Sequence, residues 1–325
     1  MYKIAKVSNQ GTTIKEVKTL QDVDIGKNVT WVHLTTRNES DLEEIRKKFG
    51  FHPLALEDCV NRQERSKVEI YDRYVFILFK DPDLKGSLII DHLALFVGEK
   101  FLVTVSSKEV DEISDIFGWV MAYPKREELT PDFITYRLLD RIVDSYFPLL
   151  DKLEGEIEEV EQIILKDPTT KGIPNKIFVI KRMLMSLRKA TWPGRDVFSS
   201  LAKEETPYFS RENRVYFRDV YDHMILVMDI MDTYRELISS ILETYLSAIS
   251  NSMNHVIKVL TVVSTIFMPL TLIASIYGMN FQGGASSSPL NMPELYSPYG
   301  YIFSLILMLV VGVVMYYYLR KKGWF

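Results

Sequence analysis

The sequence has a single cysteine, Cys59, among its 325 residues. One thiol cannot form an intramolecular disulfide, which excludes a disulfide-stapled fold. Histidines are also few: His33, His52, His92, His223 and His255. They show no metal-ligand spacing with one another, so the sequence predicts structural roles for them.

Other signals are missing as well. Residues 1–17 alternate apolar and charged side chains, a pattern unlike a signal peptide. The chain has no nucleophile elbow, phosphate loop or metal-hydrolase pattern, so we do not expect an enzyme. The net charge is only −4, and we expect no nucleic-acid partner. With 47% hydrophobic residues, the composition suits one or two soluble domains and a small membrane part.

Charged residues are absent from Val259 to Asn280, a stretch of about 20 residues that is long enough to cross a bilayer as a helix. A second apolar segment, Tyr299–Leu319, is followed at once by Arg320-Lys321-Lys322. The positive-inside rule places this C-terminus in the cytoplasm. Two spans then place the N-terminus there too and the loop 281–298 outside, so we expect a multi-pass protein of the cytoplasmic membrane.

Polar residues of the first span follow one another at alternating steps of three and four. Continued backwards, the same spacing defines one stripe along a helix from about Asn213 to Met279. We name it the polar stripe: Asp219, Asp222, Leu226, Asp229, Thr233, Glu236, Ser240, Glu243, Ser247, Ser250, Asn254, Ile257, Thr261, Ser264, Met268, Thr271 and Ser275. Its period of 3.5 implies a left-handed supercoil. A helix that lines a wet pathway has to show such a polar face to water. The alternative is that the hydroxyls bond back to their own helix or permit close packing.

Residues off the polar stripe are bulky and hydrophobic, and we expect them to be packed: Val227, Ile230, Met231, Leu237, Ile238, Ile241, Leu242, Tyr245, Leu246 and Ile249. Two spans cannot enclose a pore, so conduction requires identical copies with their stripes facing inward. Ile257 and Met268 interrupt the polar side chains of the membrane half, and Leu260 lies beside the stripe. Each is a candidate for closing the pathway by dewetting.

The outer end of this helix carries the predicted ion-selecting mouth. Gly278 is suited to ending the helix, which leaves Asn280 to present its amide oxygen. Neutral oxygens suit an ion that keeps its water, as Mg²⁺ does. We group Gly278 and Asn280 with Met279 and with Glu294, the single acid of the following loop.

The first 130 residues mix strands and helices, which predicts an α/β domain with a largely buried sheet. Strands are expected at 2–7, 13–17, 29–34, 74–79, 88–97 and 101–105, and helices at 40–49, capped by Asn38 or Ser40, and from His52. Residues 131–256 form a helical stalk region, with helices at 132–166, 175–189 and 196–201. Residues 257–325 form a two-helix membrane domain.

Charge separates two of these helices. Acids cluster between Asp151 and Glu161, whereas Lys181, Arg182, Arg188 and Lys189 make the next helix basic. Such runs are usually solvated faces. The functional alternative is an acidic, cation-collecting surface set against a basic collar.

Several motifs together resemble the CorA family of divalent-cation channels. They are Tyr277-Gly278-Met279-Asn280-Phe281, preceded by Phe267-Met268-Pro269-Leu270-Thr271 and followed by Met292-Pro293-Glu294-Leu295; the segment 216–223; Leu187-Arg188-Lys189 with Trp192-Pro193; and His52-Pro53-Leu54 with Glu57-Asp58. The resemblance covers nearly the whole chain.

This resemblance implies a funnel-shaped homopentamer that conducts Mg²⁺ through a lipid bilayer, with an αβα cytosolic domain, a stalk helix that continues into the pore, and a second span outside it. By position, Asn280 is the selectivity residue, and the pore is lined at Asn254, Ile257, Leu260, Ser264, Met268 and Thr271, with Glu243 at its inner end. Lys321 and Lys322 match a basic ring near the membrane. A regulatory Mg²⁺ is expected between Asp219 and either Asp81 or Asp83 of the adjacent copy, in a loop after the strand 74–79.

Three functions stay open. The first is passive Mg²⁺ influx, with Co²⁺ or Ni²⁺ as further ions, gated by intracellular Mg²⁺ bound between subunits. The second is Zn²⁺ transport by the same superfamily. The third is a membrane-tethered cytosolic sensor or scaffold, which explains the two spans but not the polar stripe.

Overall fold

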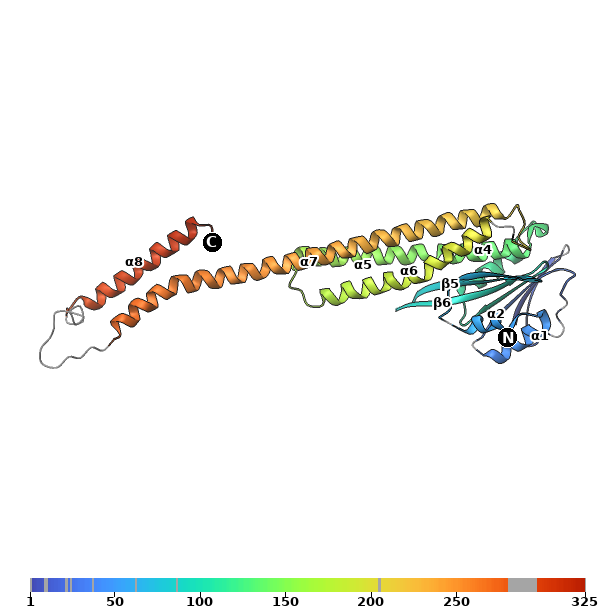
Figure 1. Ribbon diagram of the computed structural model, residues 1–325, viewed down its shortest axis with the longest axis horizontal. Coiled ribbons are helices and arrows are strands. Elements are labelled where there is room, and N and C mark those ends of the chain that lie inside the picture. Colours follow the sequence, from blue (N-terminus) through green and yellow to red (C-terminus); the bar gives the residue numbers. More distant parts are fainter. Residues whose placement is uncertain are drawn as a thin grey trace. The chain divides into compact units, whose positions relative to one another are not determined.

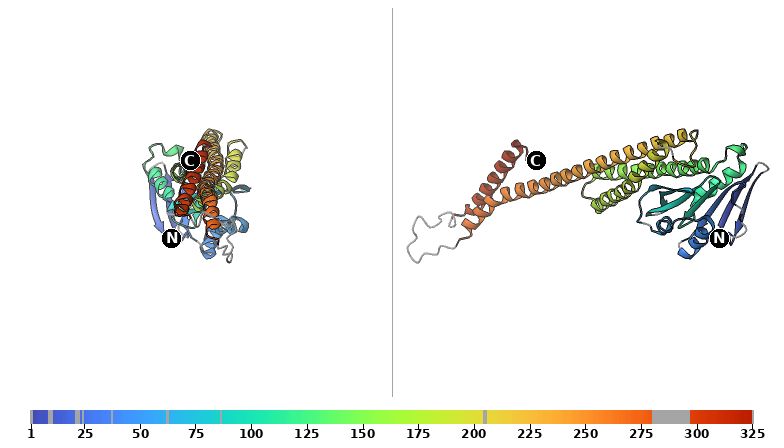
Figure 2. Two further views of the ribbon diagram at one scale, coloured as in Figure 1. Left: turned by 90° about the vertical axis from the view of Figure 1, so that its left-hand side faces the viewer. Right: turned by 45° about the vertical axis from the view of Figure 1, so that its right-hand side comes forward.

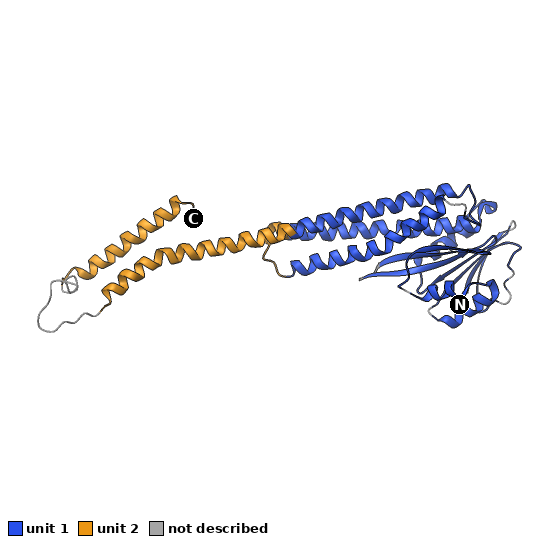
Figure 3. Ribbon diagram, viewed as in Figure 1, with its two compact units in different colours: residues 1–163, 172–242 blue, residues 164–171, 243–325 orange. Residues whose placement is uncertain are grey.

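The computed structural model describes residues 2–8, 11–20, 23, 25–36, 38–61, 63–85, 87–203, 206–279 and 297–324. Its contacts group the chain into two compact units (Figure 3). Unit 1 contains Met1–Ile163 and Gly172–Leu242, and unit 2 contains Ile164–Lys171 and Glu243–Phe325. The predicted domain limits at residues 130 and 256 stay predictions.

Unit 1 is built on a mixed sheet of seven strands in the order β2-β1-β3-β7-β6-β5-β4. Neighbouring strands are antiparallel except β3 and β7, which are parallel. The strands are β1 (Tyr2–Ser8), β2 (Gly11–Val17), β3 (Val29–Thr35), β4 (Lys67–Tyr71), β5 (Tyr74–Lys85), β6 (Ser87–Val97) and β7 (Phe101–Ser106).

Helices cover both faces of this sheet (Figure 1). On one face α1 (Glu39–Phe49) and α2 (Pro53–Val60) close an apolar core in which Phe51 stacks on Phe96 of β6, with ring centroids 4.0 Å apart. On the other face Trp31 of β3 stacks on Phe117 of α3 (Asp111–Ala122) at 3.8 Å. The predicted αβα sandwich with a mixed sheet is therefore confirmed.

Strand β5 corrects one expectation, because residues 80–85 continue the strand and are not a loop. Pro82 pairs with Ile90 of β6, whereas the ladder with β4 ends at Leu78. Proline has no N–H to donate, so it is tolerated where a strand pairs on one side only. Asp81 and Asp83 consequently lie on a strand.

Strand β4, helix α3 and the short 3₁₀ helix η1 (Arg126–Glu128) are further elements that the sequence did not predict. Asn38 stands at the N-cap of α1, but its side chain makes no capping hydrogen bond. The region 132–166 forms two helices, α4 (Pro131–Asp144) and α5 (Tyr146–Lys166). Helix α6 (Ile173–Lys203) runs unbroken through Pro193.

Helix α7 (Arg214–Tyr277) is a single helix of 64 residues, close to the predicted limits. In unit 1 it lies beside α5 and α6 (Figures 1 and 2). Most of the bulky residues off the polar stripe are buried or half-buried, as expected. Leu237 and Leu246 are exposed in the single chain. The expectation that all of these residues are packed is therefore wrong for these two.

Unit 2 contains the C-terminal part of α7 and helix α8 (Gly300–Lys321). The Lys258 ammonium donates a hydrogen bond to the Gly323 carbonyl at 2.9 Å. A Cβ at Gly312 of α8 would lie 3.8 Å from Leu270 Cδ1 of α7, in ordinary packing contact. Both α7 and α8 contain a segment long and apolar enough to cross a membrane.

Candidate ion pathway and metal centre

The polar stripe lies on an exposed side of α7, and the charge of its first residue, Asp219, also acts on Asp140 of α4. Every stripe residue from Asp219 to Ser275 is exposed except Thr261, which is half-buried. The opposite side of the helix is buried at Val227, Met231, Ile238 and Val262. The stripe is therefore free to face other copies or a water-filled space.

Bulky side chains stand on this exposed face in the apolar part of α7. Met268 is 72% exposed, Leu260 is 65% exposed and Ile257 is 53% exposed. The predicted pore-lining residues Glu243, Asn254, Ser264, Thr271 and Ser275 share the exposure. Large apolar side chains between polar ones are what a dewetting constriction requires.

Threonine hydroxyls on the stripe also make the back-bonds of the alternative interpretation. Thr261 Oγ1 donates to the Ile257 carbonyl at 2.8 Å, and Thr271 Oγ1 donates to the Phe267 carbonyl at 2.9 Å. Such a bond uses the hydroxyl proton but leaves lone pairs of the oxygen available. Back-bonding is therefore compatible with a wet face and does not decide between the two interpretations.

The outer end of α7 is described as far as Met279. The Gly278 amide donates to the Ala274 carbonyl at 3.0 Å, which keeps the last turn closed. Gly278 does not adopt a positive φ, contrary to the left-handed helix end that glycine often provides. A Cβ there would lie 3.2 Å from the Ala274 oxygen, which is a tight contact. Asn280, Glu294 and most of the loop 281–298 lie outside the described residues.

The basic end of the second span lies at the close of α8. Lys321 is its last residue, and Lys322 follows with its ammonium 5.8 Å from the Tyr318 ring centroid. Both lysines are exposed. The exposure of both lysines is compatible with the predicted basic ring. Such a ring requires further copies of the chain.

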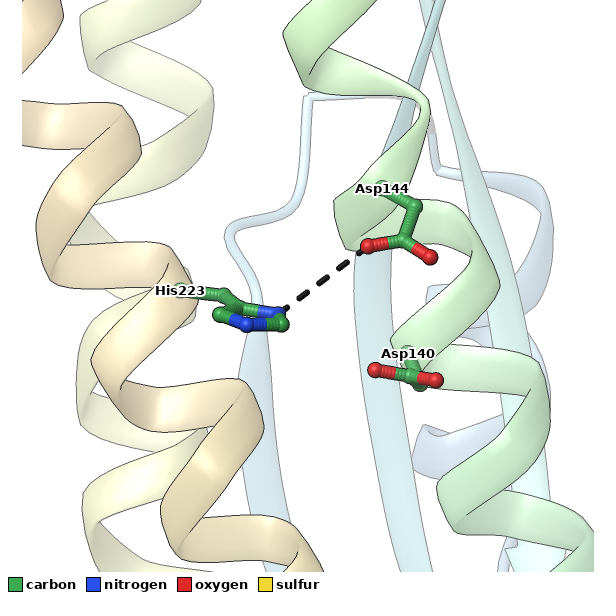
Figure 4. Close-up of side chains that lie close together, drawn as sticks. All are labelled: Asp140, Asp144 and His223. Atoms are coloured by element: carbon green, nitrogen blue, oxygen red, sulfur yellow. Dashed lines mark ion pairs between the residues drawn. The ribbon is translucent and has the colours of Figure 1, made fainter.

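A cluster of metal-ligating side chains joins α4 to α7 in unit 1. Candidate donor atoms of Asp140, Asp144 and His223 all lie within 4.8 Å of one another (Figure 4). His223 Nδ1 lies 4.0 Å from Asp144 Oδ1, and Arg137 forms an ion pair with Asp140 at 3.3 Å. All three residues of the cluster are half-buried.

The electrostatics of this cluster favour a cation. Burial raises the pKa of Asp140, and the negative charges of Asp144 and Asp219 raise it further, against the opposing effect of Arg137. Asp219 is one helical turn before His223 on α7, and its carboxylate is exposed. Three carboxylates that repel one another leave a site that a divalent ion would stabilise.

Asp81 and Asp83 differ in their surroundings. Asp81 is only 4% exposed, and burial followed by the charge of Glu112 raises its pKa to about 7. Asp83 forms an ion pair with Lys108 at 3.2 Å and lines a cavity of about 410 Å³ together with Asp144. Within one chain, Asp83 is thus the one of the two that lines a cavity together with a residue of the cluster.

Sequence inspection proposed Asp219 as a metal ligand, which stays a prediction, and did not point to Asp140, Asp144 or His223. Their spacing in sequence carries no signal, because two residues come from α4 and the third from α7. The only available hint was that Asp140 and Asp144 are four residues apart and so share one face of a helix.

Comparison with known proteins identifies the family. The family described as "CorA-like Mg2+ transporter protein" matches residues 26–321. The chain is 38% identical over 310 residues to the cobalt/magnesium transport protein CorA of Thermotoga maritima, covering 91% of this chain and 83% of that protein.

Solved structures give the same result. The complete structure of the CorA magnesium transporter from Methanocaldococcus jannaschii superposes with a TM-score of 0.85 at 25% identity, covering 100% of this chain and 99% of that chain. The ZntB cytoplasmic domain from Vibrio parahaemolyticus superposes with a TM-score of 0.63 at 11% identity, covering 77% of this chain and 98% of that chain, and shows a shared fold alone. The chain belongs to the CorA family of Mg²⁺ transporters.

Proposed function

We propose that several copies of this chain form a channel for passive Mg²⁺ influx, with the polar stripes of α7 facing a common axis. The observation that carries this proposal is the exposure of every stripe residue from Asp219 to Ser275 except Thr261, which is half-buried. A tether needs no such face. The family's homopentamer, with both termini in the cytoplasm, is the assembly that we adopt.

Ions would arrive at the mouth formed by Gly278, Met279 and Asn280, with Glu294 nearby. The C-terminal carbonyls of α7 carry the negative end of the helix dipole, which favours cations there. A membrane potential of about 100 mV supplies roughly 4.6 kcal/mol for each divalent ion that enters. Passive influx therefore needs no other energy source.

A regulatory Mg²⁺ would bind at the cluster of Asp140, Asp144 and Asp219. Mg²⁺ usually keeps several waters and binds to one or two carboxylates. His223 would then hold a coordinated water, and Asp83 of the adjacent copy would complete the site, as the family resemblance implies. An ion that bridges two copies favours the closed assembly through its differential affinity for the two states.

Uptake into liposomes by the purified chain tests this function. Mg²⁺, Co²⁺, Ni²⁺ and Zn²⁺ are compared under an imposed negative interior potential. We expect Mg²⁺ uptake that is faster under the negative interior potential and slows when the potential is abolished. Uptake of Zn²⁺ alone would support the second candidate, and no ion uptake by correctly assembled protein would favour a tethered sensor. The described residues offer no specific observation in favour of Zn²⁺.

A further inference from the structure

A groove between α6 and α7 of unit 1 has no role in the proposed pathway. It encloses about 460 Å³. Its floor is formed by the buried side chains of Leu184, Met231 and Ile238, and its wall by the exposed side chains of Met185 and Trp192. An apolar hollow of this kind has room for an apolar side chain of a partner.

The rim of the groove is basic. It carries Lys181, Arg188, Lys189 and Arg235 against one acid, Asp232. Asp232 is shared by two of these cations, since Arg188 lies 3.5 Å from it and Arg235 lies 3.7 Å from it. The rim therefore keeps a positive excess and suits a partner that is both apolar and acidic.

A surface that is both apolar and acidic lies on the other side of α7 in unit 1. Four acids of α5 follow at steps of three, four and three, which places them on one helix face: Asp151, Glu154, Glu158 and Glu161. All four are exposed, and within the described residues none of them forms an ion pair. On α7, Leu237 is 45% exposed and lies about one helical turn after Tyr234, which hydrogen-bonds to Glu154.

The α6–α7 groove and the acidic face of α5 contact α7 at the same level along its axis but on opposite sides of the helix. Glu154 accepts a hydrogen bond from Tyr234. Burial is the largest cause that raises the pKa of Tyr234 to about 12, and this hydrogen bond is the next. Arg188 reaches Asp232, only two residues away along α7. Leu237 is about 200° around the helix from Arg235, at about 100° per residue.

We infer that the α6–α7 groove of one copy receives Leu237 and the acidic face of α5 from the next copy. This inference rests on the proposed oligomeric channel and specifies its contact. Two different surfaces that match on opposite flanks make a heterologous interface, which closes into a ring when the rotation allows. Leu237 fills the apolar floor, and Glu154 and its neighbours pair with the basic rim.

Cross-linking between differently tagged chains tests this contact. Both chains carry Cys59→Ala; one also carries Met185→Cys and the other Leu237→Cys. Coexpressed and oxidised as full chains in liposomes, they should form a disulfide-linked heterodimer in up to about half of the protein, because random mixing in a ring brings the two cysteines together at about one interface in four. Either chain alone should form no disulfide, because position 185 of one copy lies opposite position 237 of the next copy and not opposite another position 185. A pair of Met185→Cys with Leu54→Cys, an exposed position on α2, is the matched control.

Charge exchange gives an independent readout if a cysteine variant assembles poorly. Lys181→Glu alone and Glu154→Lys alone should each lose most of the oligomer in detergent, and the double variant should regain it. Mg²⁺ uptake by the same preparations separates this inference from the proposed function. Normal uptake with no Met185–Leu237 cross-link, or with no rescue in the double variant, overturns the contact while the channel stands. Cross-linking without uptake overturns the channel alone.

Discussion

His223 of α7 and Asp144 of α4 face each other with 4.0 Å between Nδ1 and Oδ1. Helix α4 packs on the sheet, whereas α7 carries the polar stripe towards the membrane. This pair therefore lies at the junction between α4 and the helix that carries the polar stripe. Asp140 and Asp219 surround the same junction.

Replacing Asp219 by alanine is expected to leave conduction intact and to weaken closure by internal Mg²⁺. The half-inhibiting internal Mg²⁺ concentration should rise about ten- to a hundredfold, a range typical for losing a group that supports a metal site. Asp222→Ala, also exposed on the stripe one turn away, is the control. Closure of Asp219→Ala at the wild-type concentration would mean that Asp219 is not part of the sensor.

Acidification should reduce inhibition by internal Mg²⁺. The raised pKa of Asp140 means that its carboxyl binds a proton at a higher pH than an ordinary aspartate. A protonated carboxyl is a poor Mg²⁺ ligand, so protons compete with the ion as pH falls. Flux at fixed internal Mg²⁺ should therefore rise on mild acidification in the wild type and change much less in Asp140→Asn. Equal pH dependence in both proteins would exclude Asp140 as the titrating ligand.

Asp81 predicts a different pH effect, on stability. Its pKa in the fold is about 7, above the unfolded value, so the folded state holds the extra proton. The stabilisation of the folded state by this proton is present at low pH and is lost as pH rises from about 4 to about 7. Asp81→Asn should therefore stabilise the protein at about pH 8, by up to roughly 4 kcal/mol, and change little at about pH 4. Thermal unfolding midpoints of both proteins check this. A lower midpoint for Asp81→Asn at about pH 8 would show that the carboxylate stabilises the fold.

Long periodic segments of this chain could be predicted from sequence, and short ones with mixed signals could not. Helix α7 repeats one pattern over 64 residues, which overrides local exceptions such as Pro269. Strand β5 was predicted only to Phe79, because Asp81, Pro82 and Asp83 are typical turn residues. Pairing with β6 and burial of Asp81 extend the strand despite them.

The candidate sites divide in the same way. The polar stripe lies on one element, so its spacing alone defines it. The cluster of Asp140, Asp144 and His223 depends on how α4 docks beside α7, which no local pattern specifies. The same is true of Asp83 and Asp144, which line one cavity although 61 positions separate them.

Replacing Asn280 by alanine removes the amide proposed for the ion-selecting mouth. Because the residue follows the end of α7 at Tyr277, we expect normal assembly and loss of most selective Mg²⁺ transport. Size-exclusion chromatography and Mg²⁺ uptake into liposomes measure the two effects, and Asn251→Ala, an exposed amide off the polar stripe, is the control. Wild-type uptake by Asn280→Ala would refute the assigned role.

The central claim is that the polar stripe of α7 lines the path of Mg²⁺, and thiol block of uptake tests it most directly. In a Cys59→Ala background, single cysteines replace the stripe residues Thr261, Ser264, Met268 and Thr271, and the off-stripe residues Val262, Phe267 and Leu270. Met268 and Phe267 form the best matched pair, since they are adjacent and are 72% and 61% exposed in one chain. A charged, membrane-impermeant thiol reagent should abolish Mg²⁺ uptake through Met268→Cys and leave Phe267→Cys conducting. Equal block at both positions, or none at any stripe position, would contradict the account.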